Sequence, residues 1–405
     1  MPPGHEGPLD LLQHITGDFG PYQLRVFMVT QLTFLGVTGS LLCTVYDSLL
    51  PKELNCSESG HGSVEYDGEI DFYSLMLELR LLCERAYVSP LSFLSLHVPT
   101  LLSFTVMSGG VAGGMTFGYL SDRFGRRPFI IGAAFLCAVA NGLMALLGHL
   151  GLTVATAVVF LVGFSAGGFM VTNYVLMLET IGNERFRLLA LVLNGFPYGF
   201  MFMGLLGYLT AHWRLYHICL ALLALGPAVG MGLLLDESPR WLWQHGRRSD
   251  ALDLFLHIAS FNGRSICRNQ LVSVTEEASD TTEEASVAPV VSASRTYTYV
   301  DLLRFPSVLR PLTALALSFF SSAVIQYGII FGLGQLAHNM FLDSFLMGFF
   351  KASTATIPYL VGAWVGRKPV LLAGVAVTGL CCWFSVSLHL LGMSDSIAFT
   401  PASNT

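Results

Sequence analysis

Charged side chains are scarce in this chain of 405 residues. Asp, Glu, Lys and Arg together make up 12% of the sequence, whereas apolar residues make up 53% and the mean hydropathy is +0.61. An ordinary soluble domain carries about 25% charged residues. The composition therefore excludes such a domain and indicates a protein that crosses a membrane several times.

The sequence also lacks the patterns that accompany catalysis. Its histidines are scattered, and although His212 and His217 flank Trp213–Arg214, no carboxylate or cysteine completes a metal site there. No Walker pattern is present, so ATP-driven transport has no support. Cys381–Cys382 lies within an apolar run, where packing is expected rather than redox chemistry. We therefore expect no enzyme, no cofactor, no metal site and no nucleic-acid partner.

Nine apolar runs are long enough to cross a bilayer, which takes about 20 helical residues. They predict an all-α polytopic membrane protein with spans near residues 24–46, 94–120, 129–149, 153–176, 188–210, 215–235, 311–335, 339–364 and 370–392. The expected organisation is a cytosolic N-terminus (1–23), a six-helix half (24–242) with an outer loop (47–93), a cytosolic linker (243–310), a partial second half (311–392) and a tail (393–405). The first 20 residues lack an apolar core, so we expect no cleavable signal peptide.

The basic residues predict the orientation of the spans. With a cytosolic N-terminus, 16 of the 21 Lys and Arg residues lie inside, four lie outside, and Lys351 lies within a span. This bias follows the positive-inside rule. The outer loop then carries Asn55–Cys56–Ser57, an acceptor pattern for N-glycosylation of Asn55. Cys56 and Cys83 share that loop, where they either form a disulfide or remain separate thiols.

Local composition predicts several further features. Glycine stripes on the second and fourth spans favour close helix packing, and Asn194 with Pro197 favours a bent, cavity-lining fifth span. In the linker, residues 251–259 predict a short amphipathic helix. Residues 275–296 are rich in Ser, Thr and Glu, a composition typical of a disordered segment.

A charged stretch, Gly118 to Pro128, separates the second and third spans. It holds Asp122, Arg123, Arg126 and Arg127 between apolar flanks. Each central Asp or Arg costs about 2.5–3.5 kcal/mol on insertion scales, so the stretch should form a tight turn outside the hydrocarbon core. Because Asp122 can accept from arginine or sit at a helix N-terminus, we expect the turn to join neighbouring helix ends.

The pattern Gly-x-x-x-Asp-Arg-x-Gly-Arg-Arg in this stretch resembles the loop between helices 2 and 3 of the major facilitator superfamily of transporters. A degenerate echo, Val365–Gly366–Arg367–Lys368–Pro369, is expected six spans later if the protein has two parallel halves. Further motifs resemble the organic cation/anion transporter family (solute carrier family 22), namely residues 18–23, Trp213–Arg214, Glu237–Leu242 and Tyr327–Gly328.

This resemblance implies a major-facilitator-type fold of twelve helices. The sequence supplies a complete six-helix N-terminal half and about three helices of the C-terminal half, so the last three helices are apparently lacking. The family implies a plasma-membrane carrier of small organic ions that works by alternating access. It also implies a cytosolic gate, for which the candidates are Asp122, Arg123, Arg126, Arg127, Glu179, Arg185, Glu237 and Arg240.

Lys351 is the candidate that bears most directly on the substrate. An ionisable group near the middle of a span is costly and should face a cavity or a partner. By the resemblance, a positive charge in this helix favours an anionic substrate, whereas a structural lysine that snorkels or pairs is the alternative. Further candidates for the cavity wall are Asn173, Tyr174, Asn194, Tyr198, Gln326, Tyr327 and Phe331, each of which could instead serve ordinary helix packing.

We therefore expect a secondary-active or facilitative transporter of small organic ions in the lipid bilayer, with anions slightly favoured. A non-transporting, receptor-like or regulatory relative is the alternative, because part of the second half is missing from the sequence. An ion channel has no repeated pore motif to support it. A full-length transporter or a second copy of this chain is a candidate partner.

Overall fold

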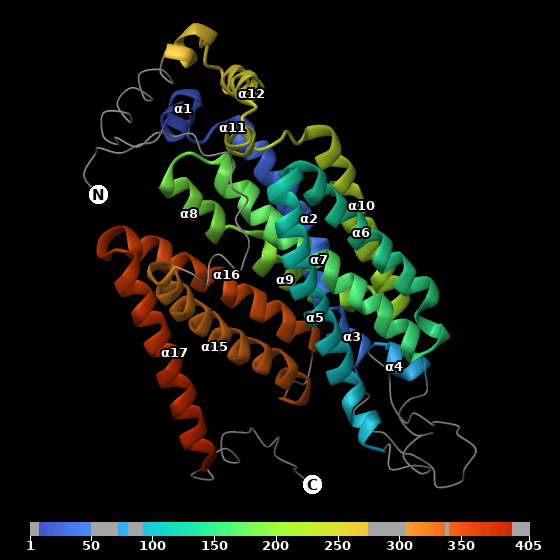
Figure 1. The fold of residues 1–405 in the computed structure, drawn as a ribbon. Coiled ribbons are helices and arrows are strands. Elements are labelled where there is room, and N and C mark those ends of the chain that lie inside the picture. Colours follow the sequence, from blue (N-terminus) through green and yellow to red (C-terminus); the bar gives the residue numbers. More distant parts are fainter. Residues whose placement is uncertain (1–7, 50–71, 80–91, 274–304, 337–339, 391–405) are drawn as a thin grey trace, which may run out of the picture. The chain divides into compact units, whose positions relative to one another are not determined.

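The computed structural model describes residues 8–49, 72–79, 92–273, 305–336 and 340–390 (Figure 1). The chain divides into two compact units. The first comprises residues 1–291 and 331–352, and the second comprises residues 292–330 and 353–405. The predicted glycosylation site Asn55, the cysteine pair Cys56 and Cys83, and the segment 275–296 lie outside the described residues.

Helices occupy all nine predicted spans. They are α2 (Pro21–Leu41), continued by the short α3 (Cys43–Asp47), α5 (Ser92–Phe124), α6 (Arg126–Leu147), α7 (Leu152–Thr180), α8 (Glu184–Val192) with α9 (Gly195–Thr210), α10 (Trp213–Leu234), α15 (Pro306–Leu336), α16 (Met340–Val365) and α17 (Arg367–Leu390). Within the described residues, seven helical stretches are long and apolar enough to cross a membrane. The predicted all-α polytopic fold is confirmed.

The first unit has the polarity of a membrane protein. Large apolar side chains, such as Phe104 on α5 and Leu233 on α10, are exposed where lipid can surround them. The interior instead contains many small polar side chains, among them Thr30, Thr33, Ser40, Ser165 and Thr172. Several of them donate to a carbonyl one turn back, as Thr172 does to Gly168 at 2.8 Å, so their hydroxyls are satisfied without water.

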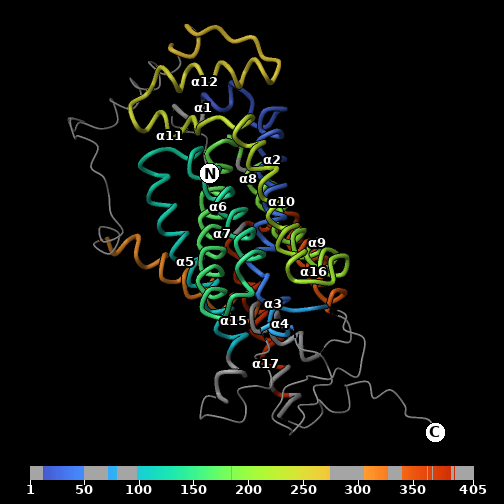
Figure 2. Tube along the Cα trace, turned by 90° about the vertical axis from the view of Figure 1, so that its right-hand side faces the viewer, coloured from blue at the N-terminus to red at the C-terminus, as the bar shows by residue number. Residues whose placement is uncertain are grey.

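Helices α5 and α7 pack backbone to backbone along the glycine stripes, and they lie side by side in both views (Figures 1 and 2). A Cβ added to Gly113 would collide with the carbonyl of Phe164, and one added to Gly163 would collide with that of Val106. This approach is closer than any larger residue permits. The predicted close-packing faces of the second and fourth spans are confirmed.

The predicted bend in the fifth span is a complete break between α8 and α9. Asn194 caps α9 by accepting a hydrogen bond from the N–H of Phe196 at 2.9 Å. Gln31 of α2 accepts a second one from the N–H of Gly195 at 2.6 Å. An asparagine cap and a polar side chain from a neighbouring helix therefore cause the break, and Pro197 only follows it.

Short helices gather at one end of the first unit, namely α1 (Pro8–Thr16), α11 (Pro239–Gln244) and α12 (Arg248–Phe261) (Figures 1 and 2). Helix α12 contains the predicted amphipathic helix 251–259. Helix α1 was missed by the sequence analysis. Its Leu12 is fully buried and packs in one cluster with Leu252 and Phe255 of α12. The N-terminal segment is thus docked onto the segment that follows α10.

Replacing Gly113 by valine should destabilise the chain by about 1–3 kcal/mol, because the branched side chain must push α5 away from α7. Gly142→Val is the matched control, since open space surrounds Gly142 on α6. Thermal unfolding of the full chain in detergent measures both variants. Equal transition temperatures for the two variants would contradict the close packing.

Candidate functional site

The charged stretch between the second and third spans is almost entirely helical. Helix α5 runs to Phe124, α6 begins at Arg126, and Gly125 alone joins them. Gly125 has a φ of 115°, which side-chain-bearing residues rarely adopt. The predicted turn is therefore one residue long, and the charged side chains lie on two adjoining helix ends.

Arg126 is the centre of a hydrogen-bonded network at this end of the first unit. Its side chain is nearly buried, and it donates to both carboxylate oxygens of Glu179 on α7, from Nε at 3.2 Å and from Nη2 at 3.0 Å. The same guanidinium donates to the Asp122 carboxylate and to the Ser121 hydroxyl on α5. A bidentate carboxylate is the partner that best compensates a buried guanidinium. The network therefore ties α5, α6 and α7 together.

Glu237 closes the N-terminus of α6. Its carboxylate accepts hydrogen bonds from the backbone N–H groups of Arg126 at 2.7 Å and Arg127 at 3.1 Å. These first-turn N–H groups have no carbonyl partner within the helix, and the helix dipole favours a negative charge there. A Cβ on Gly125 would collide with this carboxylate. The segment after α10 is thus attached to the junction of α5 and α6.

The remaining predicted gate residues have different surroundings. Arg127 donates to the carbonyl of Gly232 on α10 at 2.8 Å. Arg123 is exposed, with its guanidinium 5.4 Å from the ring centre of Phe124. Arg185 is exposed at the start of α8, and Arg240 is half-buried in α11. The structure thus brings together Asp122, Arg126, Glu179 and Glu237, whereas the side chains of Arg123 and Arg185 are exposed.

A second ion pair joins the end of α10 to the start of α2. Asp236 accepts from the guanidinium of Arg25 at 3.3 Å. That guanidinium also lies 4.5 Å from the ring centre of Phe261 on α12. Charge pairing and cation–π contact therefore hold α2, α10 and α12 at the same end as the Arg126 network.

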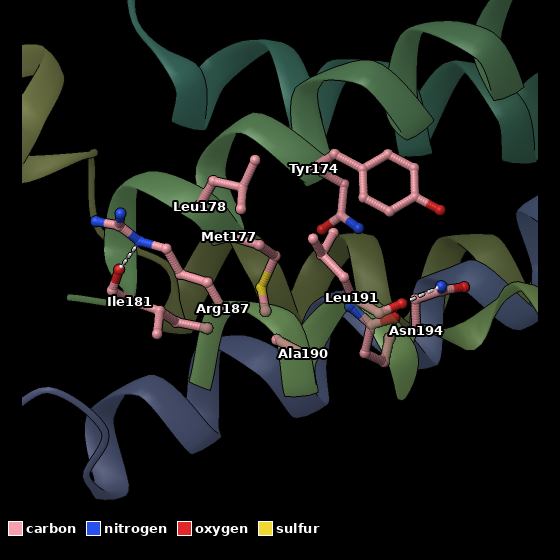
Figure 3. Close-up of a pocket in the computed structure, with 10 residues that line it drawn as sticks. Tyr174, Met177, Leu178, Ile181, Arg187, Ala190, Leu191 and Asn194 are labelled. Atoms are coloured by element: carbon pink, nitrogen blue, oxygen red, sulfur yellow. Dashed lines mark hydrogen bonds between the residues drawn. The ribbon is translucent and has the colours of Figure 1, made fainter. Parts of the chain in front are cut away.

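A small pocket with a mainly apolar lining lies in the first unit (Figure 3). It is lined by Gln31, Asn173, Tyr174, Met177, Leu178, Ile181, Arg187, Ala190, Leu191 and Asn194. Asn173 is fully buried, and within the described structure neither its amide oxygen nor its amide nitrogen has a hydrogen-bond partner. A buried polar group without a partner costs about 1–3 kcal/mol. This cost points to a binding role for the Asn173 amide.

Other predicted cavity residues have different places. The Asn194 amide is engaged, because its nitrogen donates to the carbonyl of Leu191 at 2.5 Å while its oxygen caps α9 (Figure 3). Tyr198 is exposed on α9, and Gln326 lies on α15 in the second unit. Tyr327 and Phe331 are also on α15, but their side chains lie outside the described structure.

Lys351 belongs to the part of α16 that folds with the first unit. Its Nζ lies 4.1 Å from the ring centre of Phe200 and 5.4 Å from that of Phe196, both on α9. The two helices are in close contact there, since a Cβ on Gly348 would come within 2.6 Å of the Met201 backbone nitrogen. The sequence analysis missed these two aromatic residues, although their spacing of four puts them on one helix face.

A buried cluster at the opposite end from Arg126 also escaped the sequence analysis. Cys43 and Asp47 of α3 lie beside His217 of α10, with their donor atoms within 4.8 Å of one another. The histidine is already hydrogen-bonded on both ring nitrogens, to Asp47 and to Asn141. Three ligands are also one fewer than a closed zinc site uses. We therefore assign the cluster as a hydrogen-bonded pair with its neighbours rather than as a metal site.

Comparisons with known proteins agree with this architecture. The sequence profile of the Major Facilitator Superfamily matches residues 30–402. "Solute carrier family 22 member 15-like" of Xenopus tropicalis is 26% identical over 384 residues, which cover 92% of this chain and 72% of that protein. "Solute carrier family 22 member 2" of Homo sapiens is 25% identical over 320 residues, which cover 77% of this chain and 52% of that protein. The "Beta-alanine transporter" of Drosophila melanogaster is 25% identical over 331 residues, which cover 78% of this chain and 50% of that protein.

A solved structure shares the fold. The E. coli xylose transporter XylE, in a partially occluded inward open conformation, superposes with a TM-score of 0.57 at 15% identity. The superposition covers 86% of this chain and 75% of that one. At this identity the likeness concerns the fold alone.

The helices, the charged junction and these matches define a polytopic membrane protein of a transporter class, which is not a class of enzymes. The chain belongs to the Major Facilitator Superfamily. The predicted resemblance to solute carrier family 22 is confirmed by its relatives, and so is the prediction that the chain is not an enzyme. The chain spans 72% of the Xenopus relative and about half of the human and fly relatives.

Glu179→Gln should destabilise the chain by about 3–5 kcal/mol, because it deprives the buried Arg126 guanidinium of its charged bidentate partner. Asp122→Asn should cost only about 0.2–1 kcal/mol, since 68% of the Asp122 side chain is exposed. Thermal unfolding in detergent ranks the two variants. A larger loss for Asp122→Asn would mean that the exposed carboxylate, and not Glu179, holds the network.

Gly125→Ala should lower both the yield of folded protein and its thermal stability. The new Cβ strains a positive φ and displaces the Glu237 carboxylate from the start of α6. Gly151→Ala is the matched control, because Gly151 likewise precedes a helix, α7, at a similar backbone conformation (φ 149°, ψ 165°) and has open space around it. It therefore measures backbone strain by itself. Equal losses for the two variants would show that the Glu237 cap contributes little.

Proposed function

We propose that this chain carries small organic ions across the membrane, by secondary-active or facilitative transport with alternating access. Membership of the Major Facilitator Superfamily supports a membrane transporter of small organic solutes. We further propose that organic anions are preferred. The observation that carries this preference is the place of Lys351 on the aromatic face of α9.

An anion with an apolar or aromatic body fits the surroundings of Lys351. The ammonium group attracts the charge of such a substrate, and the rings of Phe196 and Phe200 offer flat apolar contact beside it. A cation–π contact stabilises the ammonium by about 0.5–2 kcal/mol. A carboxylate of the substrate can add a charge-assisted hydrogen bond to the same ammonium group.

The Asn173 pocket is proposed as a second polar contact for the substrate. Its amide offers one acceptor and two donors that the described structure leaves without partners. Tyr174 and Gln31 contribute to the same pocket wall. A polar group of the substrate that reaches Asn173 would recover the free energy that burial of this amide costs.

The Arg126 network supports the proposal of alternating access. It joins the ends of α5, α6 and α7 to the segment after α10 through buried or partly buried bonds. In transporters with repeated halves, alternating access is largely the rocking of one rigid bundle against another. We propose that this network keeps the first six spans together as one such bundle, with its charged end in the cytosol of a plasma-membrane protein.

Lys351→Ala should reduce uptake of labelled organic anions at least about tenfold, because the attraction to a charge inside a poorly solvated site is worth more than 1.4 kcal/mol. The measurement is uptake of a panel of organic anions and cations in cells with verified surface expression. Lys351→Arg should retain part of the uptake, since it keeps the positive charge.

Lys368→Ala is the matched control, because Lys368 is exposed at the start of α17. Its uptake should equal that of the wild type. Transport of cations alone, or anion uptake that survives Lys351→Ala, would overturn the anion preference. The absence of any uptake despite normal surface expression would overturn the transport function itself.

A further inference from the structure

Asn173 of α7 carries a buried amide whose donor and acceptor are both unused. Its side chain is fully buried, and in the described structure neither Nδ2 nor Oδ1 has a hydrogen-bond partner. The residue lines the small pocket of Figure 3, whose other walls include Met177, Leu178 and Leu191. Because burial without partners costs free energy, this amide lowers the stability of the bundle until a ligand pairs with it.

The described structure holds further buried polar atoms that lack a partner. They include the hydroxyls of Thr38 and Tyr216 and one carboxylate oxygen of Asp343. Each of these side chains leaves a single atom unpaired, and none of the three lines the pocket of Figure 3. Of these four residues, Asn173 is the one that leaves two polar atoms unpaired beside a pocket. This combination favours a ligand over imperfect packing.

A second fully buried asparagine shows that this bundle can satisfy such an amide. The Asn141 nitrogen donates to the backbone carbonyl of Cys137 and to the hydroxyl of Ser40, both at 2.8 Å. Its oxygen lies 3.0 Å from Nδ1 of His217. Both polar atoms of Asn141 are therefore engaged within the protein, whereas those of Asn173 are left for a ligand.

The polar neighbours of Asn173 in the pocket wall have other partners, at the break before α9. Gln31 accepts from the N–H of Gly195 at 2.6 Å. The Asn194 oxygen accepts from the N–H of Phe196 at 2.9 Å. These contacts fix the wall, and the remaining lining is mainly apolar. A hydrogen bond to Asn173 therefore forms in surroundings of low polarity, where it is strong.

The chemistry of an asparagine amide decides what kind of group fits it. The amide is planar and presents a donor and an acceptor side by side, so it pairs with a group that offers an acceptor and a donor in the same plane. Carboxamides, lactams and ureas present such an edge. A carboxylate or a ketone offers acceptors only and leaves the amide oxygen unpaired, while an ammonium group offers donors only and leaves the nitrogen unpaired.

The pocket and Lys351 both border the start of α9. Asn194 lines the pocket and caps the helix, and Phe196 follows two residues later. The ring centre of Phe196 lies 5.4 Å from Nζ of Lys351. Two helical residues advance about 3 Å along the axis, so an elongated small molecule can contact both sites at once.

We propose that the substrates of this chain are organic anions that also carry a neutral amide-type group, and that Asn173 is the residue that selects this group. The anionic end lies at Lys351, and the amide-type group pairs with Asn173. This inference rests on the transport function proposed above and narrows its substrate class. A molecule without the group leaves the buried amide unpaired, which weakens its binding about tenfold or more.

Two probes of equal charge and nearly equal shape test the selection. They are para-carbamoylbenzoate, which carries a carboxamide, and para-acetylbenzoate, in which a methyl group replaces the amide nitrogen. The measurement is the shift in thermal unfolding temperature of the full chain in detergent at increasing concentrations of each probe, from which the dissociation constant follows. The wild type should bind para-carbamoylbenzoate at least about tenfold more tightly than para-acetylbenzoate.

Asn173→Leu should bring the ratio of the two dissociation constants close to one, because leucine offers neither a donor nor an acceptor. Lys368→Ala, which alters an exposed side chain on α17, should keep the wild-type ratio. If Asn173→Leu does not fold, Asn173→Ala takes its place. Equal affinity for both probes in the wild type, no binding of para-carbamoylbenzoate, or a ratio that survives the substitution of Asn173 would overturn the proposal.

The chain without a probe provides an independent readout. Asn141→Leu should lower the thermal unfolding temperature, because it removes the amide that pairs with Ser40 and His217. Asn173→Leu removes an unpaired amide and should leave that temperature unchanged or raise it. A loss for Asn173→Leu as large as that for Asn141→Leu would mean that a bound water already satisfies Asn173, and would overturn its binding role.

Uptake of the two labelled probes, in cells with verified surface expression, separates this inference from the transport function. Uptake that favours para-carbamoylbenzoate in the wild type but not in Asn173→Leu supports both. Selective binding without uptake would overturn the transport function and leave the Asn173 site standing. Uptake of both probes at equal rates would overturn the selection by Asn173 and leave the transport function standing.

Discussion

A charge kept from water must have a partner, and at the charged end of the first unit the Arg126–Glu179 pair meets that constraint. The guanidinium is nearly buried and is held by both oxygens of one carboxylate. Removing a carboxylate from such a pair leaves an uncompensated charge, which costs more than the exposed bond to Asp122 contributes. The helix ends around Arg126 are therefore held at fixed positions, and Glu237 adds the segment after α10 by capping α6.

The same constraint explains the other buried polar groups. Lys351 lies on aromatic rings, and His217 lies between a carboxylate and an amide. Asn173 differs, because the described structure leaves its amide without a partner. Buried polar groups whose hydrogen bonds are all made within the protein stabilise the bundle. A buried polar group that lacks hydrogen-bond partners in the protein is suited to bind a solute. In this chain the Arg126 network, the buried Asp47–His217 pair and the candidate substrate contacts thus occupy separate positions.

Much of the fold could be read from the sequence because membrane helices carry a local signal. An apolar run of the right length can only be satisfied as a helix in lipid, so helices lie at all nine predicted runs, and seven stretches of the described residues are long and apolar enough to cross a membrane. The glycine stripes indicated where α5 and α7 approach. Docked surface helices such as α1 carry a weaker signal, and α1 was missed. The members of the Arg126 network were also identified, since charges are conspicuous between apolar runs. The particular residue that each member contacts was not identified, because Glu179 and Glu237 lie 53 and 111 positions from Arg126 along the chain.

The sequence by itself determined the class of protein, the order of its apolar helices, and the charged junction, because these depend on composition and on neighbours in the chain. Only the tertiary structure decided that Asp47 meets His217, 170 positions away, and that Lys351 lies on Phe200. It also decided that the break before α9 depends on Gln31 of α2. Such contacts follow from how helices rotate and pack against one another, and a single span carries no record of which face its distant neighbour will present.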